Sequence, residues 1–104
     1  MMLLTKKLRR QLPKLYGQES KGLNAIAYVK FFMPDGHWTW YASEFDGKNV
    51  FFGFVEGDFP ELGYFALDEL QLIRGCLGLP VERDRYFQPT PLRTLMDRSS
   101  AKVR

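Results

Sequence analysis

Hydrophobic and polar residues in the middle of the chain follow the pattern of a β-hairpin. Runs rich in aromatic and β-branched residues flank Asp35-Gly36, a dipeptide favoured in two-residue turns. Such a turn makes one face of the hairpin nearly all apolar, with the cross-strand pairs Met33–Trp38, Phe31–Trp40, Val29–Ala42 and Ala27–Glu44. The opposite face is half polar and carries Ile26, Tyr28, Lys30, Phe32, Thr39, Tyr41, Ser43 and Phe45.

The pattern after the hairpin predicts further strands. The tetrapeptide Asp46-Gly47-Lys48-Asn49 predicts a turn into a third strand at residues 50–55, which is apolar on both faces apart from its glycine. An acidic loop follows, and a short strand is expected at residues 63–66. These segments extend the hairpin into an antiparallel meander.

Short helices are predicted on both sides of the meander. Apolar residues at helical spacing predict a helix at residues 5–12, with Thr5 as its N-cap and Pro13 as its end. A polar, glycine-containing loop at 16–24 leads from it to the sheet. A second helix is expected at 67–74, where Gly75 closes it.

The C-terminal segment predicts a short strand and a last helical turn. Thr90 is the expected N-cap of that turn, with Pro91 at the first helical position. Residues 97–104 are expected to fray. The chain is therefore an α+β domain over residues 1–104, with three to five strands in an antiparallel meander sheet and short helices at the N-terminus, after the meander and near the C-terminus.

Composition agrees with one folded domain. Of 104 residues, 45% are hydrophobic and 26% charged, a balance typical of globular proteins, and 15% are aromatic. Cys76 has no second cysteine to pair with, and with one histidine it cannot form a Cys/His zinc site, so we interpret it as a small core residue. The longest apolar run, residues 50–55, is too short to span a bilayer. We expect a cytoplasmic protein without membrane contact.

Charge is segregated along the chain. Residues 1–24 carry six basic residues and one acidic residue, a net charge of +5, whereas residues 35–72 carry one basic and eight acidic residues, a net charge of −7. Residues 73–104 carry seven basic and three acidic residues, a net charge of +4. The basic ends either attract an anionic partner or pair with the acidic middle across the fold. The sequence does not decide between these alternatives.

Three segments carry a resemblance to a known family: KFFMPDGHWTWYASEFDG, ELGYFALDEL and GLPVERDRYFQPTPL. Together they resemble the family called domain of unknown function 2958, over about Leu3 to Leu95. The resemblance implies a small bacterial protein without an assigned activity, so no catalytic residues carry over. It also implies a setting on plasmids and integrative elements, near or fused to DNA-processing and anti-restriction proteins.

Three carboxylates suggest one possible chemistry. Glu56, Asp58 and Glu61 lie close together in a loop with Gly and Pro, and such oxygen ligands suit Mg²⁺ or Ca²⁺. Acidic residues in a turn are more often only solvated, and the twelve-residue EF-hand pattern is absent. Glu44 or Asp46 could complete a nuclease-like set if the fold brought them together. A small metal-dependent enzyme is therefore the alternative hypothesis, and no cofactor is predicted.

The histidine at the hairpin tip is a weaker catalytic candidate. His37 could act as a general base beside a nearby carboxylate, although a lone exposed histidine is the commoner case. The sequence shows no Cys–His nucleophile pair and no Gly-rich phosphate loop. These observations favour a protein without catalytic activity.

The alternating tetrapeptide at residues 82–85 has two interpretations. On a strand, Arg83 and Arg85 would share one side and could hold a phosphate or a partner's carboxylate as a fork. The alternative is an edge strand whose charges discourage aggregation between sheets.

The most complete binding signal combines basic and aromatic residues. The N-terminal helix supplies cations for phosphates, and the half-polar sheet face supplies rings for stacking on bases. The residues are Lys6, Lys7, Arg9, Arg10 and Lys14, together with Tyr28, Lys30, Phe32 and Tyr41. The alternative is that the helix is only solvated and the rings are core beneath the C-terminal helices.

We therefore expect a non-enzymatic binding or accessory protein of mobile-element DNA metabolism. Its expected partners are nucleic acid, a DNA-processing protein, or a second copy of the chain in a homodimer. A further alternative is a protein-interaction module or an inhibitor of a host defence or DNA-processing complex, in which the acidic residues 44–69 would imitate DNA phosphates.

Overall fold

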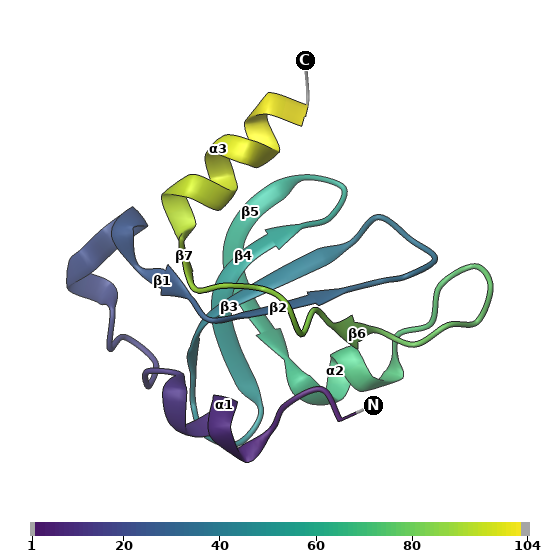
Figure 1. The fold of residues 1–104 in the computed structure, drawn as a ribbon, viewed down its shortest axis with the longest axis horizontal. Coiled ribbons are helices and arrows are strands. Elements are labelled where there is room, and N and C mark those ends of the chain that lie inside the picture. The colour runs from purple at the N-terminus through teal and green to yellow at the C-terminus, as the bar shows by residue number, and fades with distance from the viewer. Residues whose placement is uncertain (1, 103–104) are drawn as a thin grey trace.

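The computed structural model describes residues 2–102 (Figure 1). Three α-helices, one 3-10 helix and seven strands follow one another along this part of the chain. In order they are α1 (Lys6–Gln11), η1 (Glu19–Asn24), β1 (Ile26–Ala27), β2 (Val29–Phe32), β3 (Thr39–Phe45), β4 (Val50–Glu56), β5 (Pro60–Ala66), α2 (Leu67–Leu72), β6 (Glu82–Arg83), β7 (Thr90–Pro91) and α3 (Leu92–Lys102).

Most strands belong to one antiparallel sheet of five strands, in the order β5-β4-β3-β2-β6. The consecutive strands β2 to β5 form the predicted meander, and β6 adds to its edge beside β2. The two short strands β1 and β7 form a separate antiparallel pair. The α+β class and the meander are thus confirmed.

The hairpin register follows the Asp35-Gly36 prediction over most of its length, but the two-residue turn does not form: the Gly36 N–H donates to the Met33 carbonyl at 3.4 Å, which centres the turn on Pro34 and Asp35. Val29 pairs with Ala42 and Phe31 with Trp40, and the Met33 N–H donates to the Trp38 carbonyl at 3.1 Å. The next turn forms as predicted. Asp46 Oδ1 accepts the backbone N–H groups of residues 48, 49 and 50 at 2.8–3.0 Å, and Gly47 takes φ +87°.

The predicted pair Ala27–Glu44 is wrong, because a side chain enters the sheet at this point. Ala27 pairs with Thr90 instead. The Gln18 amide accepts the Ile26 N–H and donates to the carbonyls of Ile26 and Ser43, all at 2.8–2.9 Å. The glutamine thereby takes the bonds that a strand partner would have made.

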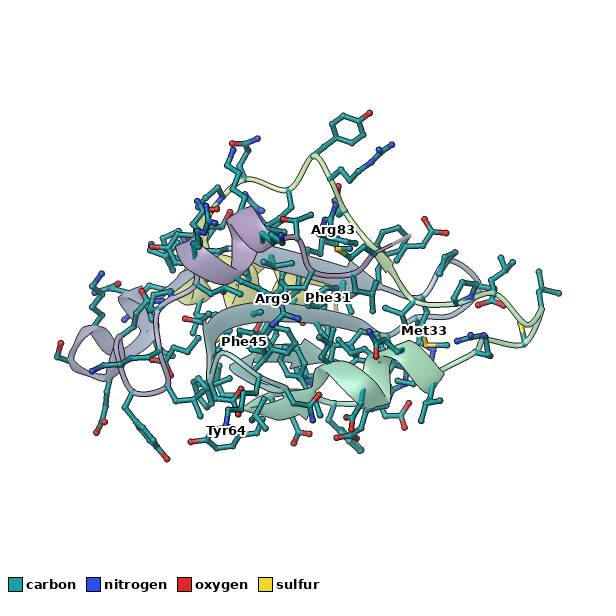
Figure 2. The ribbon with its side chains drawn as sticks, turned by 90° about the horizontal axis from the view of Figure 1, so that it is seen from below. Arg9, Phe31, Met33, Phe45, Tyr64 and Arg83 are labelled. Carbon is teal, nitrogen blue, oxygen red and sulfur yellow. The ribbon has the colours of Figure 1, made fainter. Side chains whose placement is uncertain are left out.

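A bulge in β3 changes the face of its last residue. The register with β4 shifts between Ala42 and Glu44, so Ser43 is the extra residue. Phe45 consequently lies on the same face as Phe51, with ring centroids 4.5 Å apart, rather than on the half-polar face. Figure 2 shows Phe45 in the interior of the fold.

The first cluster of buried apolar residues covers one face of the sheet. It joins strand residues such as Phe31 and Phe51, which are both fully buried, to the N-terminal segment, α1 and α2. From outside the sheet it contains Leu3, Leu4, Leu12, Leu67, Leu70 and Val81. Thr5 caps α1 as predicted, since its Oγ1 accepts the Leu8 N–H at 3.2 Å.

The second cluster covers the opposite face, beneath α3. It contains Ala25, Ala27, Tyr41, Phe54, Leu92 and Leu95. Thr90 does not cap the helix as predicted: it lies in β7, and the Leu92 N–H donates to the Ala25 carbonyl. The helix continues through Lys102, far beyond the single turn expected, and Ser99 is buried on it. Residues 103–104 of the expected frayed tail lie outside the described residues.

Other boundaries differ from the predictions in instructive ways. The strand β5 begins at Pro60, three residues early, because the acidic segment pairs with β4 instead of forming a loop. The predicted loop at 16–24 contains η1, and α2 ends at Leu72. Cys76 is exposed and not a core residue; its Sγ donates to the Asp35 carbonyl oxygen at 3.3 Å.

Candidate nucleic-acid interface

The helix α1 presents its basic residues to solvent. Its apolar side packs on the first cluster through Leu8. At 100° per residue, Lys6 and Arg10 lie opposite Leu8, and Lys7 and Arg9 lie on the two flanks. All four are exposed, and so is Lys14 just after the helix.

Arg9 differs from the other cations because it is held by the fold. Its guanidinium carbon lies 5.5 Å from the centroid of the Phe45 ring, and Nη1 donates to the Gly47 carbonyl at 3.5 Å (Figure 2). Arg9 thereby connects α1 to the β3–β4 turn, which carries the exposed Lys48. We call Lys6, Lys7, Arg9, Arg10, Lys14 and Lys48 the α1 surface. Lys48 was missed in the sequence because only the turn geometry places it beside the helix.

The acidic middle of the chain does not neutralise the α1 surface. Within residues 2–102 the ion pairs are Lys30–Asp84 at 3.7 Å and His37–Asp58 at 3.1 Å. Neither involves a residue of α1. The sequence left open whether the basic N-terminal segment pairs with the acidic middle of the chain. The described structure does not contain such ion pairs.

One carboxylate does lie near this surface. Three backbone hydrogen bonds, led by that from Asn49, hold the pKa of Asp46 below its usual range, so it is ionised at neutral pH. Its Oδ1 faces its own turn. Asp46 therefore reduces the local positive charge by one, and its attraction to Lys48 makes only a small contribution to its lowered pKa.

The predicted aromatic platform does not exist as one exposed face. Tyr28 packs against the first cluster, whereas Tyr41 is buried in the second, stacked on Phe54 at 5.9 Å. For Tyr41 the core alternative is the correct one. Lys30 lies on the α3-covered face of the sheet, paired with Asp84, and is not part of the α1 surface.

Burial also changes the chemistry of Tyr41. Loss of hydration raises its pKa to about 12, with a smaller contribution from the negative charge of Glu56. The ring borders a polar cavity of about 230 Å³, together with Lys30, Glu56, Arg98 and Ser99. The tyrosine is a neutral group in that cavity at physiological pH.

The two arginines of the edge segment do not form a fork. Arg83 Nη1 donates to the carbonyls of Met2 at 2.8 Å and Leu3 at 3.1 Å, which ties β6 to the N-terminal segment (Figure 2). The strand ends at Arg83, and Asp84 begins a turn by accepting the Tyr86 N–H. Arg85 is exposed within that turn. Residues 82–83 form an edge strand of the five-stranded sheet, as the alternative expected. That their charges discourage aggregation stays a prediction.

The three metal-site candidates do not converge. Val55 pairs with Glu61 and Glu56 with Pro60, so Glu56 and Glu61 lie on opposite faces of the sheet. Asp58 instead contacts His37, and both side chains are about 70% exposed. Glu44 is buried and accepts the N–H groups of Tyr16 and Gln18, both at 2.9 Å. No group of three or more His, Cys, Asp or Glu side chains suited to a metal ion occurs in residues 2–102.

A family model described as "Protein of unknown function (DUF2958)" matches residues 3–101, nearly the whole chain. The chain belongs to the DUF2958 family. Comparison with curated proteins and with solved structures finds no match. Among residues 2–102 of this DUF2958 protein, no helix has the length and apolar character needed to cross a bilayer.

Proposed function

We propose that this DUF2958 protein is a non-enzymatic accessory protein that binds nucleic acid through the α1 surface. The observation that supports this proposal is the set of cations on α1 that have no acidic partner within residues 2–102. Cations that are not neutralised within the protein bind phosphates and release the counterions of the nucleic acid. The setting in mobile-element DNA metabolism, implied by the family resemblance, belongs to the same proposal.

The geometry supports contacts to the phosphate backbone rather than reading of bases. Tyr41 is unavailable for stacking because it lies beneath α3, and Phe45 is buried under Arg9. Binding is therefore expected to depend strongly on salt and weakly on sequence.

The proposal is tested by fluorescence anisotropy with labelled single-stranded and duplex DNA and RNA, at low and physiological salt. The informative variant is Lys6→Glu with Arg10→Glu, because both side chains point away from the core. Arg9 is left unchanged, since its contact with Phe45 would mix effects on folding with effects on binding. The double variant is expected to bind at least about tenfold more weakly, with a salt dependence reduced by about two phosphate contacts.

A matched control carries the same change in charge elsewhere. Lys21→Glu with Arg93→Glu alters exposed residues of η1 and α3, two elements that lie apart from α1 (Figure 1). It is expected to lose much less affinity than the α1 variant. Equal loss in both double variants, or no binding by the wild type at low salt, would contradict the proposal. Binding to a DNA-processing protein and formation of a homodimer stay predictions. Light scattering tests the homodimer.

A further inference from the structure

An aromatic pocket of about 400 Å³ opens on the face of the sheet that α2 covers. Its apolar lining comes from the β2–β3 hairpin, β4, β5 and the end of α2: Met33, Trp38, Trp40, Val55, Phe65 and Ile73. The two indole rings lie 5.9 Å apart and are tilted by 32°. Figure 2 shows Met33 reaching towards α2. The volume lies in the usual range for ligand sites.

The pocket exists because neither α2 nor β5 supplies side chains that fill this space. The helix α2 has only six residues, so it covers part of this face and leaves the end of the meander open. Gly63 lies on the same face of β5 as Glu61 and Phe65 but has no side chain there. A β-carbon built at Gly63 meets no atom within 4 Å, so the space in front of it is open.

Two carboxylates stand beside these rings. Glu61 comes from β5 and Glu69 from α2, and both border the pocket. Both are exposed, and neither side chain has a hydrogen bond or an ion pair with another group of residues 2–102. The mouth is therefore negative while its walls are aromatic and aliphatic.

This combination is suited to an organic cation. Indole faces attract cations electrostatically, and carboxylates bind them by charge-assisted hydrogen bonds. A metal ion does not suit the pocket, because the lining offers mostly apolar carbon instead of oxygen ligands. A guanidinium group suits it best, because its plane stacks on tryptophan and its edge donates to two carboxylates. We propose that the pocket binds an arginine side chain of a partner protein.

An exposed leucine beside the pocket favours a protein-borne arginine over a free small molecule. Leu72 lies one helical turn after Glu69 and is 81% exposed. A free cation that enters the pocket would leave this side chain in water. An apolar residue next to an arginine in a peptide would cover it, which extends the contact beyond the pocket.

The two tryptophans are the only ones in the chain, and both line the pocket. The experiment follows their indole N–H signals by NMR during titration with the capped peptide acetyl-Leu-Arg-Leu-amide. A saturable shift of both signals is expected. The same peptide with citrulline, which is neutral and similar in shape, is expected to bind at least about tenfold more weakly because it lacks the charge. The affinity of the same peptide with lysine in place of arginine is expected to lie between those of the arginine and citrulline peptides.

Three variants locate the site. Glu61→Gln with Glu69→Gln is expected to weaken the arginine peptide about tenfold, whereas the charge-matched control Glu19→Gln with Asp97→Asn leaves it within about twofold. Gly63→Leu is expected to fill the pocket and abolish the shifts. Leu72→Ser is expected to weaken the peptide but not arginine amide alone, which separates a partner protein from a free guanidinium compound.

A second glycine of the sheet serves as a comparison for the stability of the Gly63→Leu variant. The neighbouring position across the ladder is Gly53, where an added β-carbon would lie impossibly close to the Tyr41 carbonyl. Gly53→Ala is therefore expected to destabilise the protein, while Gly63→Leu keeps the wild-type melting temperature or raises it. Equal binding of the citrulline and arginine peptides, no shift at millimolar arginine peptide, or full binding by a folded Gly63→Leu variant would overturn the proposal.

Discussion

Gln18 shows how one buried polar side chain organises the start of the sheet. It is only 2% exposed, and its amide joins the backbone of β1 to that of the bulge in β3. Its own N–H donates to the Glu44 carboxylate at 2.9 Å. Gln18 and Glu44 thus replace several backbone hydrogen bonds between strands by side-chain hydrogen bonds. These bonds satisfy backbone groups that are shielded from water.

Replacement of Gln18 by methionine is expected to destabilise the fold by about 2–4 kcal/mol, because the similar-sized side chain leaves the Ile26 and Ser43 backbone groups without partners. Urea unfolding measured by circular dichroism tests this. Gln88→Met, a change at an exposed glutamine, is the control and is expected to stay within about 0.5 kcal/mol. A Gln18→Met protein as stable as the control would show that water satisfies these groups.

At the scale of elements, α3 decides what the half-polar face of the sheet can do. The helix carries Leu92 and Leu95 against Phe54 and Tyr41. It converts a surface that resembles a stacking platform into a second hydrophobic layer. The phenol of Tyr41 is thereby held in a partly dehydrated environment, which has a measurable consequence at high pH.

The pKa of Tyr41 is about 12 in the folded protein, against 10.0 for an ordinary tyrosine. As the pH rises through 10 the unfolded chain loses this proton first, so the free energy of unfolding is expected to fall between pH 10 and pH 12 and to be unaffected below pH 10. Tyr41→Phe removes this loss. Urea unfolding of both proteins across the alkaline range measures the difference, and parallel profiles would contradict the prediction.

At the scale of the whole molecule, one sheet serves two cores. The first cluster, with Trp40, lies on one face, and the second lies on the other. The strands β3 and β4 contribute side chains to both clusters. The two clusters share the same sheet, so unfolding of one cluster removes the strands against which the other packs. Unfolding of the whole protein is therefore expected to be cooperative.

Leu95→Ala tests this coupling. The leucine is 5% exposed in the second cluster, so its truncation is expected to cost about 2–4 kcal/mol. The loss is expected to appear equally in tryptophan fluorescence, although both tryptophans lie on the other face, and in circular dichroism. A shift of the circular dichroism midpoint alone would mean that α3 unfolds separately from the meander.

The sequence by itself determined the local features of this protein. The hairpin register was visible around Asp35-Gly36, although the turn itself is centred on Pro34 and Asp35. Thr5 marked the start of α1, and the three motifs indicated the family. These features depend on residues close together in the chain, where turn chemistry and spacing act directly. The basic residues of α1 were visible for the same reason.

Only the tertiary structure decided which groups meet. Gln18 reaches β1 and β3 across the fold, and this displaces the Ala27–Glu44 pair and accompanies the bulge that turns Phe45 inward. The tertiary structure also buries Tyr41 beneath α3 and places Glu56 and Glu61 on opposite faces of the sheet. It likewise forms the pocket that Glu61 and Glu69 border. These contacts join residues far apart in sequence, so their geometry is set by packing of whole elements and not by any local pattern.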